Sequence, residues 1–208
     1  MFSDAYTVID PKNADVLLEQ LNSLVEGSQF EPKDLHILTH HLPFYSEYAL
    51  FEVTDISTHP ERSISFIGKT DFKNDNLYIL NGTNESIYAL NEKLPIALTD
   101  KNVRTYVLFF FAYVRGRFGQ FKIIEHIDDI QWREEPSLSG RKALAKMIEP
   151  LAIKSVAENG DFTLSASIVF KDTLFEADII VSMDGKINLS NQEMLVEDIP
   201  VLDDTIGQ

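Results

Sequence analysis

The sequence predicts an α+β protein in which one buried helix packs on a curved antiparallel sheet. The run from Leu98 to Glu125 is the most apolar and most aromatic part of the chain, and its first part has helical spacing. The last third alternates apolar and polar residues, as strands with one buried face do. A helix followed by a long antiparallel sheet is the layout of α+β folds, in which helices and strands are segregated.

The central helix is expected to span about 99–115. Thr99 is a suitable N-cap because its hydroxyl can accept from an N–H of the first turn, and Gly116 suits the position after the last turn. Between them Phe110 lies in the middle of an apolar helix face. The other faces are almost as apolar, so the helix is predicted to be buried. The apolar run is too short for a membrane span, which needs about 20 residues.

The first half is predicted to contain one helix followed by three or four short strands. The helix covers residues 11–26, where apolar residues form one stripe that stops at Gly27. The predicted strands lie at 48–57, 64–67 and 77–83. Residues 31–48 contain two prolines and are expected to be irregular.

Two histidines in that irregular segment raise the hypothesis of a metal site. His36 and His40 are four residues apart, a spacing that would place both imidazoles on one face of a helix. The zincin pattern requires Glu directly after the first His, whereas Ile37 stands there. We therefore expect solvated or structurally bonded histidines and no metal ion.

The last third is predicted to be a β-meander with strands at 151–158, 161–170, 173–183 and 186–190. Its first turn contains Asn159-Gly160. A two-residue loop there would pair Ile153 with Ala166 and keep the apolar residues of both strands on one face. We therefore predict a type I′ turn.

The last turn of the meander contains Asp184-Gly185 and is predicted to differ. A two-residue loop would set apolar residues against polar ones along the whole hairpin. A three-residue loop of residues 183–185 instead pairs Val181 with Ile187 and places Gly at the left-handed position. Burial should select this longer loop.

The outer face of the meander carries acidic side chains, including Glu176 and Asp178. If this face is covered by a partner, the carboxylates need basic neighbours, and we expect Arg141, Lys142 and Lys146 to supply them. If it is solvated, these carboxylates serve solubility alone.

The second half of the chain resembles, in layout only, the cystatin-like and NTF2-like cones, in which a sheet wraps a helix. No motif carries this resemblance, and a fold does not define a function. The chain has 208 residues, which suggests a single domain or two closely packed halves, 1–97 and 98–208.

Composition excludes several classes of partner. The net charge of −15 repels phosphate backbones and anionic lipid surfaces, so neither nucleic-acid nor membrane binding is expected. There is no Cys, and hence no disulfide framework or thiolate chemistry. The first residues lack the pattern of a signal peptide, which makes the cytoplasm the expected location.

The weak candidates for chemistry lie after the central helix. His126, Asp128 and Asp129 belong with Glu125 to the densest cluster of potential bases and ligands, where carboxylate and imidazole could hold a divalent metal or act as acid and base. Side chains alternate sides along a strand, which argues against all of them converging.

A second group of weak candidates would bind a ligand. Tyr113 and Trp132 could line a pocket between the central helix and the sheet, with Arg115 and Arg117 as polar groups. Aromatic residues at helical spacing are more often core residues.

Two hypotheses for function remain open. The first is an acidic, non-catalytic binding or interaction module, with a protein partner or a homodimer formed through a sheet face. The second is a small-ligand-binding protein or an enzyme with a pocket between the central helix and the sheet. The sequence contains no P-loop, G-x-S-x-G or G-x-G-x-x-G pattern, so no cofactor is expected.

Overall fold

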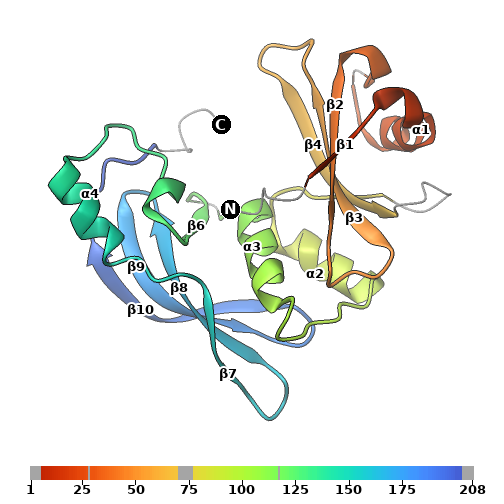
Figure 1. Ribbon diagram of the computed structural model, residues 1–208. Helices are drawn as coiled ribbons and strands as arrows, with labels where there is room; N and C mark the ends of the chain where they lie inside the picture. The colour runs from red at the N-terminus through yellow and green to blue at the C-terminus, as the bar shows by residue number, and fades with distance from the viewer. Residues whose placement is uncertain (1–5, 28, 70–76, 117, 203–208) are drawn as a thin grey trace. The chain divides into compact units, whose positions relative to one another are not determined.

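The computed structural model describes residues 6–27, 29–69, 77–116 and 118–202. Contacts divide the chain into two compact units, which meet in sequence at Asn81 and Gly82. Each unit combines helices with one antiparallel sheet that has five strands among the described residues, so the α+β class is confirmed (Figure 1). The boundary expected from the sequence lay between residues 97 and 98. Whether the chain forms one domain or two stays a prediction.

The sheet of the first unit has the strand order β1-β2-β3-β4-β5, so each strand pairs with its neighbours in the chain. Two 3₁₀ helices, η1 (Pro11–Asn13) and η2 (Pro32–Asp34), and one α-helix, α1 (Asp15–Leu24), complete the described part of this unit. The strands are β1 (Thr7–Ile9), β2 (Leu35–His41), β3 (Tyr48–Asp55), β4 (Arg62–Lys69) and β5 (Tyr78–Ile79).

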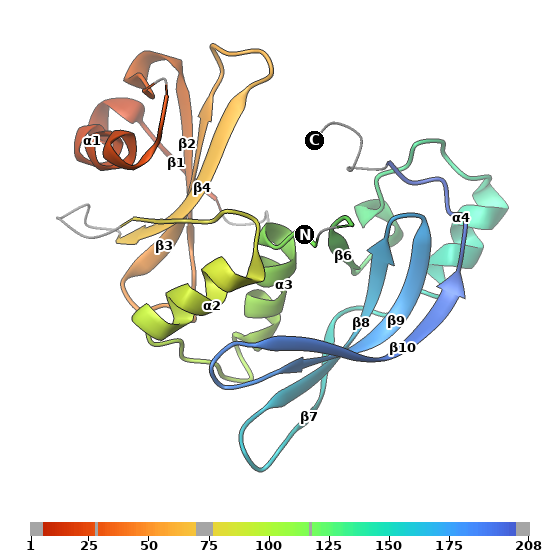
Figure 2. The ribbon, with the colours of Figure 1, turned by 180° about the vertical axis from the view of Figure 1, so that it is seen from behind.

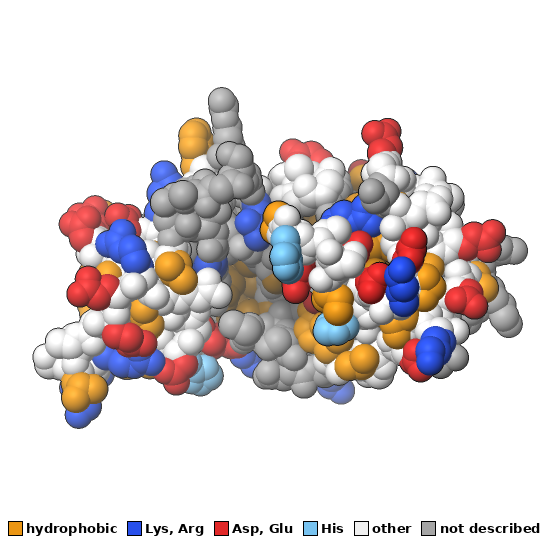
Figure 3. Space-filling model, turned by 90° about the horizontal axis from the view of Figure 1, so that it is seen from above, with side chains coloured by type: hydrophobic (Ala, Val, Ile, Leu, Met, Phe, Trp, Pro, Cys, Tyr) orange, Lys and Arg blue, Asp and Glu red, His pale blue; other side chains and the backbone are white. Residues whose placement is uncertain are grey.

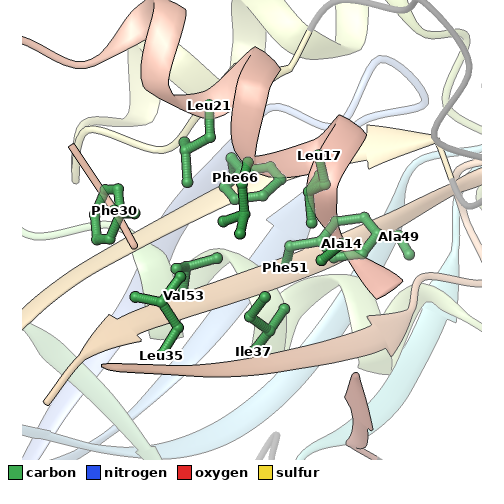
Figure 4. Packing of buried hydrophobic residues seen from close by; sticks show 11 residues of the cluster. Ala14, Leu17, Leu21, Phe30, Leu35, Ile37, Ala49, Phe51, Val53 and Phe66 are labelled. Carbon is green, nitrogen blue, oxygen red and sulfur yellow. The ribbon is translucent and has the colours of Figure 1, made fainter. Parts of the chain in front are cut away.

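Helix α1 covers one face of this sheet and forms the core of the first unit with it (Figure 4). Leu17 and Leu21 of the helix point toward Phe51 and Phe66 of the central strands, whose rings stack with centroids 5.3 Å apart. All four side chains are fully buried. Each contributes about 1.5–3 kcal/mol through removal of apolar surface from water.

The expected irregular segment 31–48 is in part wrong, because most of residues 35–41 alternate in and out of the core as strand β2. Leu35 and Ile37 are buried. The expectation of a loop rested on Pro32 and Pro43, which lie on either side of this strand. His36 is exposed and His40 is buried. Four residues of a strand span roughly 13 Å, which is too far for two imidazoles to share one ion.

The second unit contains α2 (Asn84–Lys93), α3 (Val103–Tyr113), η3 (Ile127–Asp129) and α4 (Leu138–Ala145). Its curved, open sheet has the order β10-β9-β8-β6, with β7 also paired to β8 (Figure 2). The strands are β6 (Phe121–Ile124), β7 (Ala152–Val156), β8 (Phe162–Phe170), β9 (Thr173–Val181) and β10 (Ile187–Val196). The likeness to cystatin-like or NTF2-like cones stays a prediction.

Strands β6 and β7 share one edge of β8. Strand β7 pairs with Phe162–Ser165, and β6 pairs with the following half of β8. Between them Glu149 binds Ser167 twice: its N–H donates to the Ser167 hydroxyl at 2.8 Å, and its C=O accepts from the Ser167 N–H at 3.3 Å. This contact fixes the point at which the returning chain rejoins the sheet.

The central helix is buried as predicted, and Phe110 is 5% exposed. The expected limits of about 99–115 extend beyond α3 at both ends, because the helix spans Val103–Tyr113. The Asn102 side chain accepts from the Thr99 N–H and donates to the Ala97 C=O, both at 2.8 Å, and so stabilises a turn before the helix. Local side-chain bonds of this kind compete with helical hydrogen bonds.

The two hairpin registers had different outcomes. Val181 pairs with Ile187 and Ile179 with Leu189, so the three-residue loop at residues 183–185 is confirmed. The two-residue loop at Asn159-Gly160 is wrong, because Ile153 pairs with Leu164. Strand β7 is mostly exposed, so burial did not select its register.

The outer face of the second sheet is partly covered. Leu174, Val169 and Ile124 form a small core there with α4, η3 and the segment around Ile199. Asp178 is buried on this face, but its basic neighbour is Lys154 at 2.7 Å rather than Arg141, Lys142 or Lys146. Lys154 comes from β7, where a register shift alters the alternation.

Candidate functional site

The predicted catalytic cluster folds around η3, which follows β6. One oxygen of Asp129 accepts the backbone N–H groups of Glu125 at 2.9 Å and His126 at 2.8 Å. The first N–H groups of a helix lack intrahelical partners, and a capping box of this kind satisfies them. The Asp129 carboxylate is therefore engaged in holding the turn.

The other two members of this cluster are exposed to solvent. The side chains of His126 and Asp128 have exposed fractions of 78% and 80%. The His126 ring nitrogen Nδ1 lies 4.0 Å from the Asp129 carboxylate oxygen, too long for a hydrogen bond between the two side chains. Across the described ranges, no three His, Asp or Glu side chains lie close enough together to hold a metal ion.

Arg141 of α4 ties Asp128 and Trp132 to the rest of the unit. Its guanidinium pairs with Asp128 and, at 2.8 Å, with Glu135. It also lies 6.0 Å from the centre of the Trp132 ring. Trp132 itself packs against the small core that contains Leu174. These contacts hold α4 near η3 and account for Asp128 without a ligand, whereas the Trp132 indole N–H is buried and donates no hydrogen bond among the described residues.

The remaining ligand candidates lie at the end of α3. Tyr113 is half-buried, and its ring centre lies 5.3 Å from that of Phe109. Arg115 is exposed, and its backbone N–H donates to the Gly82 C=O at 2.7 Å. Arg117 lies outside the described residues.

The end of α3 is fixed by Gln120 rather than by the expected Gly116. The Gln120 amide nitrogen donates to the carbonyls of Phe111 at 2.7 Å and Ala112 at 2.9 Å. The last carbonyls of a helix lack intrahelical donors, so this side chain acts as a C-terminal cap from the residue just before β6.

A hollow of about 230 Å³ lies between α3 and β6. Its apolar lining comes from Leu108, Phe111 and Ala112 of the helix and from Ile123 and Ile124 of the strand. Sites for drug-sized ligands have volumes of about 300–1,000 Å³ and are lined mainly by apolar residues. The hollow therefore has the lining of a binding site and the size for a small ligand.

Four polar residues complete the lining: Gln120, Lys122, Asp129 and Gln131. Two of them are used by the fold, since Gln120 caps α3 and Asp129 caps η3. Lys122 donates to the Gln131 side-chain oxygen at 3.3 Å, just beyond the usual N–H···O range. A cation and a carboxamide at the rim of an apolar hollow can orient a bound polar group.

Most of this lining was not predicted as a site. Asp129 was the one candidate that lines the hollow, whereas Tyr113, Arg115, His126, Asp128 and Trp132 do not line it. The signal available in the sequence was Lys122, a single charge in the apolar strand 121–124. Gln120 and Gln131 gave no signal, because their roles depend on chain segments packed beside them.

A second hollow of similar volume lies near Lys171 and Ile199. Its lining contains Arg133 and Lys171 together with Asp172 and Asp198, so both signs of charge are present. With little apolar surface beside these charges, it offers less to a small organic ligand than the hollow beside α3.

Three acidic groups of the second unit have clearly shifted pKa values, and they lie on the β9–β10 hairpin and its neighbours. Burial raises the pKa of the Tyr106 phenol well above its ordinary value. A hydrogen bond from Lys186, supported by one from Ser182, lowers the pKa of Asp184 to about 2. Hydrogen bonds from Lys154 and Asn191 lower the pKa of Asp178. All three have structural partners.

Comparison with known proteins identified no family model, no curated protein and no solved structure that matches the chain. Within the part of the chain that the structure describes, every helix is too short or too polar to cross a membrane.

Proposed function

We propose that the protein is a non-catalytic binding module whose binding site is the hollow between α3 and β6. The observation that carries this proposal is that the acidic and the apolar side chains of residues 120–131 have different roles. Asp129 there holds a turn and Asp128 an ion pair, while the neighbouring apolar side chains line an open space of about 230 Å³. This arrangement suits binding better than proton transfer.

The surface charge is consistent with a small ligand rather than a polyanion. Acidic and basic side chains are interspersed on the face shown in Figure 3. With a net charge of −15, attraction to nucleic acid or to an anionic membrane is not expected. A cytoplasmic location, a protein partner and a homodimer stay predictions.

The proposal is tested by screening a library of small apolar and amphiphilic compounds against ¹⁵N-labelled protein. We expect binders to shift the backbone amide signals of residues 108–112 and 120–124, which surround the hollow. Ala112→Phe fills the hollow and should abolish these shifts. Ala89→Phe is the matched control, because Ala89 is an exposed helical alanine of α2 away from the lining.

Catalysis is tested with the same compounds. Binders should be recovered chemically unchanged after long incubation, and His126→Ala should leave their affinity unaltered. Conversion of a compound at a rate that falls in His126→Ala would contradict the proposal. Binders whose shifts map away from α3 and β6, or that survive Ala112→Phe, would also contradict it.

A further inference from the structure

The hollow near Lys171 and Ile199 is lined by two cations and two carboxylates that do not pair with one another. Its volume is about 230 Å³, and its charged lining consists of Arg133, Lys171, Asp172 and Asp198. Among the described residues, no ion pair joins either cation to either carboxylate. Both signs of charge therefore line one space, and they add to zero in a chain with a net charge of −15.

Three chain segments hold the backbone around this hollow. The Arg133 N–H donates to the Pro200 C=O at 2.8 Å, and the Ile199 N–H donates to the Asp172 C=O at 2.9 Å. Both bonds join the segment around Ile199 to its neighbours, and the side chains of Ile199 and Val201 are buried. The charged residues are exposed, but the backbone that carries them is fixed.

Two of the four charged residues have a left-handed backbone. The φ angle is 54° at Lys171, in the turn between β8 and β9, and 57° at Asp198. Residues other than glycine are uncommon in this region, although Asp tolerates it better than Lys. Such conformations persist where the surrounding structure imposes them, and they concentrate at functional sites. Two of them at one hollow favour a binding role for it.

The charged side chains differ in what else they contact. Among the described residues, the guanidinium of Arg133 and the carboxylate of Asp198 have no side-chain partner. The Lys171 ammonium lies 5.7 Å from the centre of the Phe170 ring and 6.0 Å from that of Phe118. Arg133 and Asp198 are therefore the groups most open to a ligand, and Lys171 adds positive potential beside them.

Size and charge together narrow the class of ligand. The volume is below the 300–1,000 Å³ or so of sites for drug-sized ligands, so the ligand is small. An anion alone would meet two carboxylates, and a cation alone would meet two cations. The charges that make this hollow less suitable for an apolar compound are therefore what a doubly charged ligand requires.

We infer that this hollow binds a small zwitterion, a free α-amino acid, with the ligand carboxylate on Arg133 and the ligand ammonium on Asp198. The guanidinium fork matches the geometry of a carboxylate, and both contacts are charge-assisted. Lys171 and Asp172 add one charge of each sign. One Asp172 oxygen accepts from the Thr173 hydroxyl at 3.4 Å, which leaves the other oxygen for the ligand ammonium.

This site is separate from the hollow between α3 and β6. The two linings have no residue in common. The inference therefore goes beyond the proposed function and does not depend on it. Ala112→Phe, which fills the hollow beside α3, should leave amino-acid binding unaltered.

The inference is tested with L-alanine, propanoate and ethylamine. The second lacks the ammonium of L-alanine and the third lacks its carboxylate. Titrations of the ¹⁵N-labelled full chain at neutral pH are followed by the amide shifts of residues 133, 171–173, 198, 199 and 201. We expect L-alanine to bind about three- to fivefold more tightly than either analogue, because an exposed ion pair contributes up to about this factor.

Two variants that each remove one charge should have opposite preferences. Arg133→Gln should weaken L-alanine and propanoate but not ethylamine. Asp198→Asn should weaken L-alanine and ethylamine but not propanoate, and Asn also tolerates the left-handed backbone. Arg115→Gln is the control, because Arg115 is exposed and lies outside the lining, and it should bind all three probes like the parent.

Several outcomes would overturn the inference. They are equal affinity of L-alanine and either analogue, the absence of saturable shifts at these residues, and a variant that weakens all three probes alike. Shifts of L-alanine confined to residues 108–112 and 120–124 would also overturn it, while leaving the proposed site in place. Apolar binders that survive Ala112→Phe would contradict the proposed function alone.

Discussion

The two hairpin turns of the second sheet have the same backbone and different surroundings. In each, a three-residue loop ends in a glycine with positive φ, +89° at Gly160 and +80° at Gly185. Each loop is closed by the same pair of backbone hydrogen bonds, 2.8 and 2.9 Å long in the first turn and 3.0 and 2.8 Å long in the second. Local chemistry therefore makes the turns alike.

The surroundings of the two glycines are what differ. A Cβ atom at Gly160 would lie 3.0 Å from the sulfur of Met183, the middle of a flexible and exposed side chain. A Cβ at Gly185 would lie 2.4 Å from the Asn91 amide nitrogen and 2.6 Å from the Tyr106 hydroxyl. The first turn is bordered by a side chain that can move, and the second by buried polar groups of α2 and α3.

A hydrogen-bond network fastens the second turn to the two helices. The Tyr106 hydroxyl donates to the Gly185 C=O at 2.6 Å, and Asn91 donates to the Tyr106 oxygen at 3.0 Å and to the Asp184 C=O at 3.1 Å. Buried polar groups are costly unless they are paired. The comparison shows that two turns with the same loop length and hydrogen bonds differ in what packs against them, and we expect their contributions to stability to differ for that reason.

The largest expected effect comes from removing the packing beneath this network. Phe110 stacks on Tyr88, with ring centres 5.8 Å apart, and is almost fully buried. Phe110→Ala should lower the free energy of unfolding by about 3–5 kcal/mol through lost burial and a residual cavity. Urea unfolding measures this loss. An unchanged midpoint would show that Phe110 is not a core residue.

The glycines themselves test the comparison directly. Gly160→Ala should cost about 1–2 kcal/mol, the strain of a left-handed non-glycine residue. Gly185→Ala adds the displacement of Asn91 and Tyr106, for which overpacking costs about 1–3 kcal/mol more. The two variants are compared by thermal and urea unfolding. Equal losses would mean that the buried network does not constrain the second turn.

The hydroxyl of Tyr106 comes next in size. Tyr106→Phe leaves the Gly185 carbonyl without this donor and should cost about 1–3 kcal/mol. Tyr88→Phe is the control, because its bonds to Ile187 are 3.2 and 3.5 Å long and its ring is half-buried, so its loss should be smaller. A larger loss for Tyr88→Phe than for Tyr106→Phe would reverse the assignment.

Alkaline pH offers a second measurement on the same residue. Burial raises the folded-state pKa of Tyr106 above the ordinary 10.0, so the unfolded chain ionises first. Stability is therefore complete below pH 10.0 and falls as the pH rises above it. Tyr106→Phe should flatten this fall.

The smallest effect concerns the residue before each glycine, Asn159 in the first turn and Asp184 in the second. The pKa of Asp184 is lowered from 3.8 to about 2 by its bonds to Lys186 and Ser182. Its contribution to stability is present above pH 3.8 and is lost as the pH falls toward 2. Since its side chain is more than half exposed, solvent screens this contribution.

The exchange Asp184→Asn gives the second turn the Asn-Gly sequence of the first. It should reduce the slope of stability against pH between 3.8 and about 2, measured by urea unfolding at several pH values. Asn159→Asp is the reciprocal control, which places a carboxylate in the first turn. Among the described residues, Lys186 pairs with the carboxylate of the second turn only, so this variant should not gain the same dependence of stability on pH. An unaltered slope of stability against pH in Asp184→Asn would show that this carboxylate does not contribute to stability in acid.

The sequence by itself determined the features that depend on local pattern and burial. The α+β class, the buried Phe110 and the strands of the meander all followed from the spacing of apolar residues. The register at Val181 and Ile187 followed as well, because both strands have one apolar face and a slip of one residue would expose it.

The tertiary structure decided the features that depend on a distant partner. Strand β7 has little buried surface, so its register could not be selected by hydrophobic pattern. The limits of α3 depend on side chains of Asn102 and Gln120, which compete with or complete helical hydrogen bonds. Asp178 meets Lys154 across two strands, although basic residues of α4 were equally available in the sequence.

The hollow beside α3 also belongs to the tertiary structure. Its lining joins residues 108–112 with residues 120–131, and neither segment alone shows a binding motif. Periodicity reports which side chains leave water, because each apolar residue gains free energy on burial regardless of its neighbour. It does not report where two buried surfaces fail to fill the space between them, since that depends on the shapes of both.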